Sequence, residues 1–179
     1  RIGITGTTFS ANEAGAVYTK LCSVDTFRAA ASVGTSNGCV ALANGQQAQV
    51  LGTGSVYAAS GAAFAVDCIA GYWNSDNTGA CDIVPAGKVG LTAAASAGAT
   101  ASVSAAILVQ DCPAGTYKAL AGASNCIDVS AGKVGRTSDT ARTTVANSIH
   151  EAGAIVEVGC VPGSYRSTST GSANCIVVP

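Results

Sequence analysis

Short runs of apolar residues, separated by polar or glycine-containing stretches, recur along the whole chain. Four of them directly precede a cysteine: AVYTKL, AAFAVD, AAILVQD and AIVEVG, which begin at Ala16, Ala62, Ala105 and Ala154. Their Val, Ile, Phe and Tyr side chains favour pleated strands. In IAGYW, PAGTY and VPGSY, which follow three of the runs, Gly or Pro precedes an aromatic residue, a pattern typical of a turn into another strand. The pattern therefore predicts pairs of short strands joined by turns.

One segment is ambiguous. The alanines of LTAAASAGATASVSAA (91–106) permit a helix, but the interleaved Gly, Ser and Thr weaken that interpretation. We interpret the segment as strand and loop, with a helix as the alternative. No apolar run is long enough to cross a bilayer, so we expect no membrane insertion.

The cysteines reveal a fourfold repeat. They form four pairs in sequence, and the first members lie 46, 44 and 48 residues apart. Six residues before each first cysteine is an alanine, five after it is an aromatic residue, and three after each second cysteine is an apolar residue. The alanines are Ala16, Ala62, Ala106 and Ala154, the aromatics Phe27, Trp73, Tyr117 and Tyr165, and the apolar residues Leu42, Val84, Val129 and Val178. We expect an all-β chain of four tandem units stacked end to end: repeat 1 (1–45), repeat 2 (46–87), repeat 3 (88–132) and repeat 4 (133–179).

The small size of each unit explains why it contains cysteines. About 45 residues, rich in Ala and Val, bury too little apolar surface to fold well alone, so a disulfide is expected to staple each unit. Closing a loop of about 15 residues contributes roughly 3 kcal/mol. The simplest pairing is within each repeat, although eight cysteines can pair in 105 ways and sequence alone leaves the others open. The pairs are Cys22 with Cys39, Cys68 with Cys81, Cys112 with Cys126, and Cys160 with Cys175.

The stretch CPAGTYKALAGASNCIDVSAGKV (112–134) resembles the cysteine-rich repeats of the GCC2/GCC3, or ephrin-receptor-like, type, which read roughly C-P-x-G-T-Y, a loop, and C-x-x-C-P-x-G-T-Y. About 25 residues in each of three repeats are similar. Val84 and Val129 occupy the place of the second cysteine of C-x-x-C, so the disulfide pattern of that family does not carry over. Such repeats occur in large extracellular and surface proteins, many from protists and algae. The resemblance implies a structural role at the cell surface and no catalytic residues.

Composition narrows the possible partners and the compartment. A net charge of −1 with 11% charged residues gives no basic surface for nucleic acid or anionic membrane. An even number of regularly spaced cysteines predicts disulfides formed outside the cytosol, so we expect an extracellular or cell-surface protein.

Few residues offer catalytic or metal-binding chemistry. The one histidine, His150, has no marked nucleophile or orienting group, and a surface or turn role is the better interpretation. No C-x-x-C motif suggests zinc, Val follows Lys in AGKVG where a P-loop needs Ser or Thr, and NSDNTG lacks the EF-hand spacing. We therefore expect no enzyme, cofactor or metal site.

The recurrent aromatics have two interpretations. The favoured one is that each packs beside the disulfide of its own repeat, and the other is a ladder of sugar-stacking platforms. Ser/Thr-rich loops such as RSTSTGS (166–172) are candidates for O-linked sugars.

The two chain ends fall at the same phase of the repeat, since Arg1 aligns with Lys88 and Lys133, and Pro179 with Pro85 and Ser130. Three explanations fit. A processing site could lie in the stretch CDIVPAGKVGLT (81–92) and its equivalents, the chain could be part of a longer repetitive protein, or the end of one molecule could contact the start of the next. We expect a structural subunit that assembles head to tail into an extracellular filament or surface coat, with copies of itself as partner. The residues expected to meet are Arg1, Ile2, Ile4, Ile176, Val177 and Val178. The alternative is an adhesin, or a glycan- or protein-binding module of a larger surface protein.

Overall fold

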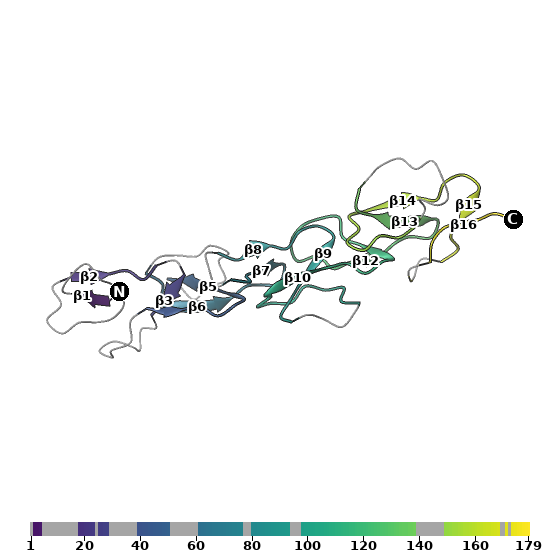
Figure 1. The fold of residues 1–179 in the computed structure, drawn as a ribbon. Helices are drawn as coiled ribbons and strands as arrows, with labels where there is room; N and C mark the ends of the chain where they lie inside the picture. Colours follow the sequence, from purple (N-terminus) through teal and green to yellow (C-terminus); the bar gives the residue numbers. More distant parts are fainter. Residues whose placement is uncertain are drawn as a thin grey trace.

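The chain forms a row of small β-hairpins, seen in a computed structural model (Figure 1). The structure describes residues 2–4, 18–23, 25–28, 39–50, 61–76, 80–93, 98–138, 149–168, 171 and 173–179. These residues contain strands and turns but no helix, which confirms the all-β prediction. Within the ambiguous segment, residues 91–93 and 98–106 are strand end, bend, turn and bridge, and 94–97 lie outside the described residues.

Two kinds of antiparallel hairpin alternate along the row. The first kind pairs the start of a repeat with the apolar run before the cysteine: β1 (Ile2–Ile4) with β2 (Tyr18–Lys20), β5 (Gln46–Gln49) with β6 (Phe64–Asp67), β9 (Lys88–Leu91) with β10 (Leu108–Asp111), and β13 (Lys133–Arg136) with β14 (Val156–Gly159). The second kind contains the aromatic residue: β3 (Thr26–Phe27) with β4 (Val40–Ala41), β7 (Tyr72–Trp73) with β8 (Asp82–Ile83), β11 (Thr116–Tyr117) with β12 (Ile127–Asp128), and β15 (Ser164–Tyr165) with β16 (Ile176–Val177).

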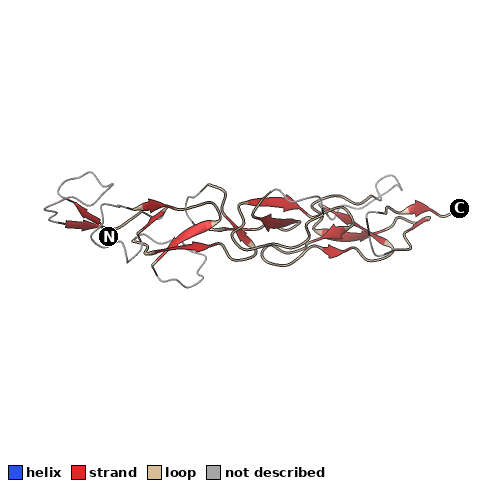
Figure 2. Ribbon diagram, turned by 90° about the horizontal axis from the view of Figure 1, so that it is seen from below, coloured by secondary structure: helices blue, strands red, loops and turns tan. Residues whose placement is uncertain are grey.

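The hairpins follow one another in sequence order, so the molecule is a rod. Figures 1 and 2 show β1 and β2 at one end and β15 and β16 at the other. The division into four repeats, both their number and their boundaries, stays a prediction, although β5, β9 and β13 begin at the predicted boundaries.

All four cysteine pairs are joined within their predicted repeats, which confirms the simplest connectivity. Their Cα atoms lie 5.6 to 5.8 Å apart, within the usual range for a disulfide. The first cysteines of repeats 1 to 3 are almost fully buried, at 0 to 1% exposed. Each disulfide links the segment after the first hairpin to the residue directly before the second strand of the next hairpin, and so holds the two hairpins of a repeat together.

The core is divided into small clusters rather than concentrated in one place. One cluster joins Val89 and Leu91 of β9 to the Cys112–Cys126 disulfide. Another joins Leu42, Ala48 and Ala62. In β5 and β9 three consecutive residues are buried, which differs from the alternation of a strand with one wet face. In β9, the disulfide of the same repeat covers Val89 and Leu91, and Val84 of the preceding repeat covers Gly90 between them.

The residue before the repeated alanine adopts a left-handed backbone. It is Gly61 (φ 74°) in repeat 2 and Gly153 (φ 71°) in repeat 4, but Ala105 (φ 54°) in repeat 3. Ala105 is the only residue other than glycine with positive φ in the described part of the chain.

Replacing Ala105 with glycine is expected to stabilise the protein by up to about 1 kcal/mol. Relief of the left-handed strain gains roughly 1 kcal/mol or more, and the greater freedom of glycine in the unfolded chain offsets part of it. Denaturant unfolding of Ala105→Gly measures this, with Gly153→Ala as the matched reverse change. The reverse variant should be destabilised, because its Cβ would also lie 3.1 Å from Asp111 Oδ1. A less stable Ala105→Gly variant would contradict the assignment of strain.

Candidate functional site

The contact between successive repeats, here called the joint, has the same backbone hydrogen bonds at each of its three occurrences. In one bond, the backbone N–H of the residue after the aromatic donates to the carbonyl oxygen of the repeated alanine in the next repeat. In the other, the backbone N–H of the residue before that alanine donates to the carbonyl oxygen of the first cysteine in the preceding repeat. The first bond is Arg28 to Ala62 (3.0 Å), Asn74 to Ala106 (2.9 Å) and Lys118 to Ala154 (2.9 Å), and the second is Gly61 to Cys22 (2.7 Å), Ala105 to Cys68 (2.7 Å) and Gly153 to Cys112 (2.8 Å). Short parallel bridges between Phe27 and Ala62 and between Trp73 and Ala106 accompany them.

Close apolar packing accompanies these bonds. A Cβ added to Gly90, the third residue of β9, would lie 2.9 Å from Val84 Cγ2 and 3.1 Å from Ala106 Cβ. A Cβ added to Gly135 in β13 would meet Ala154 and Val129 at 3.0 and 3.1 Å. Repeat 2 has Ala48 here, packed with Leu42 and Ala62. Each joint thus brings three residues together. A small strand residue and the repeated alanine of one repeat pack on the apolar residue that lies three positions after the second cysteine of the preceding repeat.

The residue directly after the aromatic has a second role that sequence reasoning missed. Asn74, Lys118 and Arg166 occupy this position and are buried, at 4%, 1% and 4% exposed. Their side chains donate to backbone carbonyls at the start of their repeats: Asn74 Nδ2 to Gln46 (3.1 Å), Lys118 Nζ to Lys88 (2.8 Å) and Arg166 Nη1 to Lys133 (3.4 Å). Lys118 Nζ also donates to Gly122 at 2.6 Å. Burial lowers the pKa of the Lys118 ammonium, because the charged form loses hydration.

The expectation of a surface position for His150 is wrong, because the residue is only 8% exposed. The physical reason is a hydrogen bond: Nδ1 accepts the backbone N–H of Gly135 at 3.0 Å. Ser102 has the equivalent position in repeat 3, where its hydroxyl accepts the N–H of Gly90 at 3.1 Å. His150 therefore helps to fix the strand that packs at a joint.

Ion pairs lie along the first hairpins. Lys88 pairs with Asp111, Lys133 with Glu157, and Arg136 with Glu151. The hydrogen bond and charge of Glu157 raise the pKa of Lys133. Burial acts to raise the pKa of Glu157, but hydrogen bonds from Lys133 and Ser130 outweigh it and lower that pKa. These pairs are partly exposed; the first two join neighbouring strands, and the third joins β13 to the segment before β14.

At the C-terminal end of the rod, the residues that form a joint elsewhere are open to solvent. Val178 is 53% exposed, whereas its equivalents Leu42, Val84 and Val129 are at most 3% exposed. Gly132 is exposed, whereas Gly45 and Gly87, at the same position of the repeat, are buried. Gly163 is also exposed, whereas its equivalents Gly71 and Gly115 are buried. We call Gly132, Cys160, Gly163, Tyr165 and Val178 the terminal face.

The structure only partly describes the residues expected to meet in assembly. Ile176 and Val177 are exposed at 54% and 62% next to Val178. Ile2 and Ile4 lie in β1, but their side chains and Arg1 are outside the described residues. Their contact with another molecule stays a prediction.

The recurrent aromatics lie where each repeat meets the next. Phe27 packs against the cluster of Leu42, Ala48 and Ala62, so it contacts the following repeat. Phe27, Trp73 and Tyr117 are partly buried, and Tyr165 at the terminal face is 42% exposed. Neither packing beside the disulfide nor sugar stacking is tested by this placement, and both interpretations stay predictions.

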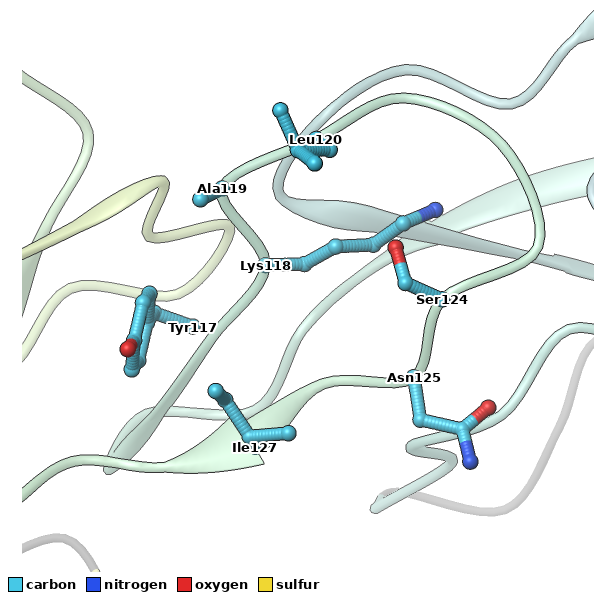
Figure 3. Close-up of a pocket in the computed structure, with 7 residues that line it drawn as sticks. All are labelled: Tyr117, Lys118, Ala119, Leu120, Ser124, Asn125 and Ile127. Carbon is cyan, nitrogen blue, oxygen red and sulfur yellow. The ribbon is translucent and has the colours of Figure 1, made fainter.

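A shallow hollow of about 240 Å³ lies beside the aromatic of repeat 3. Figure 3 shows Tyr117 and Ile127 on one side of it and Ala119 and Leu120 on the neighbouring loop. The lining residues are Tyr117, Lys118, Ala119, Leu120, Ser124, Asn125 and Ile127. Leu120 and Ile127 are 72% and 54% exposed, so the hollow presents mainly apolar surface.

No group of three or more potential metal-ligating side chains occurs among the residues that the structure describes. No helix there is long and apolar enough to span a membrane.

Neither a protein-family model nor a curated protein matches the chain. The resemblance to GCC2/GCC3-type repeats is therefore still a prediction. The four disulfides indicate an oxidising environment of the kind met by secreted proteins.

Proposed function

We propose that the protein is a non-catalytic structural subunit of an extracellular filament or surface coat, which assembles head to tail with copies of itself. The observation that carries this proposal is the joint that recurs three times with the same hydrogen bonds and packing. A surface that is used three times within one chain suits addition of another unit of the same kind.

The shape of the molecule supports the same function. The first and last hairpins lie at opposite ends of the rod (Figure 1). A contact between two different surfaces at opposite ends does not close on itself, so repeated addition produces a filament rather than a dimer. Disulfide staples suit such a subunit, because they hold together units whose own cores are small.

Electron microscopy of native, unreduced protein tests this function. We expect uniform filaments whose axial repeat corresponds to one rod of four predicted repeats. Sedimentation at rising concentration should show growth to large species. Discrete monomers at high concentration under oxidising conditions would contradict the proposal.

The hollow beside Tyr117 favours a second candidate, a module that binds a glycan or another protein. It combines an aromatic side chain with Ser124 and Asn125, a mixture found in many ligand sites. The same microscopy separates the two functions, because a binding module of a larger surface protein predicts monomers and not filaments.

A further inference from the structure

We propose that Asn44 is a site of spontaneous modification that the fold keeps closed: it converts to aspartate or isoaspartate only when the turn around it is released from Asn74. The dipeptide Asn44–Gly45 carries the chemistry. Because glycine has no side chain to hinder its backbone nitrogen, this nitrogen can attack the side-chain amide of the preceding asparagine. The inference is independent of whether the chain forms filaments.

The reaction needs water and no other partner. The backbone nitrogen of Gly45 gives up its proton to solvent and attacks Cγ of Asn44. A C–N bond forms, a cyclic imide closes, and the side-chain nitrogen takes a proton from solvent and leaves as ammonia. Water then opens the imide at either of its carbonyl carbons. Opening on one side gives aspartate, and opening on the other gives isoaspartate, in which the backbone runs through the former side chain.

The geometry of the turn holds the reacting groups apart. The N–H of Gln46 donates to the carbonyl of Ala43 at 3.2 Å, and Gly45 has φ 78° whereas the φ of Asn44 is negative, so these four residues form a type II turn. In such a turn the second residue has ψ of about +120°. The imide requires ψ of the opposite sign, with the Gly45 nitrogen eclipsing Asn44 Cβ. The turn therefore has to open before the ring can close.

Asn74 holds this turn closed with two hydrogen bonds, an arrangement here called the clasp. Its carbonyl accepts the N–H of Gly45 at 2.8 Å, which is the N–H that the reaction must remove. Its side-chain Nδ2 donates to the carbonyl of Gln46 at 3.1 Å. On the other side of the same residue, the carbonyl of Gly45 accepts the N–H of Cys68 at 2.7 Å. Asn74 is 4% exposed and Gly45 is buried, so water has little access to these bonds.

The same clasp recurs in the two following repeats, where the turn contains alanine instead of asparagine. The residue after the aromatic again accepts from the turn glycine and donates its side chain to the next carbonyl: Lys118 with Gly87 (2.9 Å) and Lys88 (2.8 Å), and Arg166 with Gly132 (2.9 Å) and Lys133 (3.4 Å). Ala86 and Ala131 occupy the place of Asn44. The turn therefore does not require an amide at this position, and Asn44→Ala removes the chemistry while keeping the turn.

The two products differ in what they do to the fold. Asn44 is exposed, so the side chain of an aspartate stays in water and the turn is kept. Isoaspartate inserts one extra carbon into the backbone and displaces Gly45. This glycine packs so closely that even an added Cβ would collide with the carbonyl oxygen of Ala105. A chain that has opened and formed isoaspartate therefore cannot restore the turn, and the modification marks it permanently.

The test follows deamidation at Asn44 in the full, oxidised chain by mass spectrometry of its peptides, under native conditions and in urea with the disulfides intact. We expect the native rate to be roughly a hundredfold or more below the rate in urea, because the buried bonds of Gly45 must open first. Asn44→Ala assigns the signal, since a second Asn–Gly dipeptide, Asn37–Gly38, lies outside the described residues. Equal rates in the two conditions would overturn the inference.

Hydrogen exchange of the Gly45 amide tests the mechanism without any substitution. The opening that exposes this N–H to solvent is the one that frees the nitrogen for attack. The native rate of deamidation should therefore equal the rate in urea divided by the exchange protection factor of Gly45. A native rate far from this value in either direction would show that a different step controls the reaction, and would overturn the role of the clasp.

Asn74→Ala tests the clasp itself. The variant loses the Nδ2 donor but keeps the backbone carbonyl, and it should raise the native rate at Asn44 by roughly tenfold, the effect of one lost hydrogen bond on the opening equilibrium. Asn74→Lys is the matched control, because lysine has this role in repeat 3 and should restore most of the protection. An unchanged rate in Asn74→Ala would overturn the role of the clasp. If this variant does not fold, the exchange comparison decides.

Discussion

Replacing Arg166 with alanine is expected to lower the free energy of unfolding by about 3 kcal/mol. The side chain is 4% exposed, and its guanidinium donates to five backbone carbonyls. They belong to Val129 and Ser130 of repeat 3 (both 3.0 Å) and to Lys133 (3.4 Å), Gly171 (3.1 Å) and Ala173 (2.8 Å) of repeat 4. Alanine leaves these acceptors without a donor and opens a cavity where the repeats meet.

Arg166→Lys is the matched control, because Lys118 occupies the same position in repeat 3 and donates to two carbonyls. An ammonium cannot reproduce the planar fork of a guanidinium, so this variant should lose about half as much stability. Denaturant unfolding with the disulfides intact gives both values, and hydrogen exchange of residues 173–175 gives the local effect. A loss below about 1 kcal/mol in Arg166→Ala would mean that water replaces the side chain.

These buried polar side chains mark the limit of what the sequence could predict. The strands, the turns and the pairing of cysteines follow from local patterns: β-branched runs, Gly before an aromatic, and one cysteine pair in each unit. A polar residue directly after an aromatic has no such local signal, because its burial depends on a neighbouring repeat. The available signal was its recurrence as Arg28, Asn74, Lys118 and Arg166, all with side-chain N–H donors.

The burial of His150 and the place of the strand glycines at the joints could not be predicted, for the same reason. A single histidine among polar residues favours a surface position, and only the N–H of Gly135, fifteen residues earlier, makes burial favourable. The last glycine of AGKVG, Gly90 or Gly135, lies in a strand at a joint, and nothing in the local sequence predicts this contact. The joint as a whole depends on how separate hairpins stack, and its backbone hydrogen bonds leave no trace in the side-chain pattern.

The stacking of repeats leads to the second large effect, which comes from removing a disulfide. Replacing Cys112 and Cys126 together with alanine is expected to destabilise the chain by about 3 kcal/mol from loop entropy alone, since they are 14 residues apart. Further loss follows because both sulfurs pack with Val89 and Leu91 in a core cluster. Repeat 3 also forms joints with both repeat 2 and repeat 4.

The Cys160 and Cys175 pair is the matched control, because its separation of 15 residues gives nearly the same loop entropy. Repeat 4 forms an internal joint on one side only. In a linear array, where stability is the sum of the units and of their nearest-neighbour contacts, loss of an inner unit removes two contacts and loss of an end unit removes one. Calorimetry should therefore show a larger fall in unfolding temperature for the variant without Cys112 and Cys126 than for the variant without Cys160 and Cys175. Only the first variant should also show separate unfolding transitions for the two halves of the rod. Equal losses would mean that the disulfides act within isolated units and that the joints contribute little to stability, a result that would also weaken the case for the same joint between molecules.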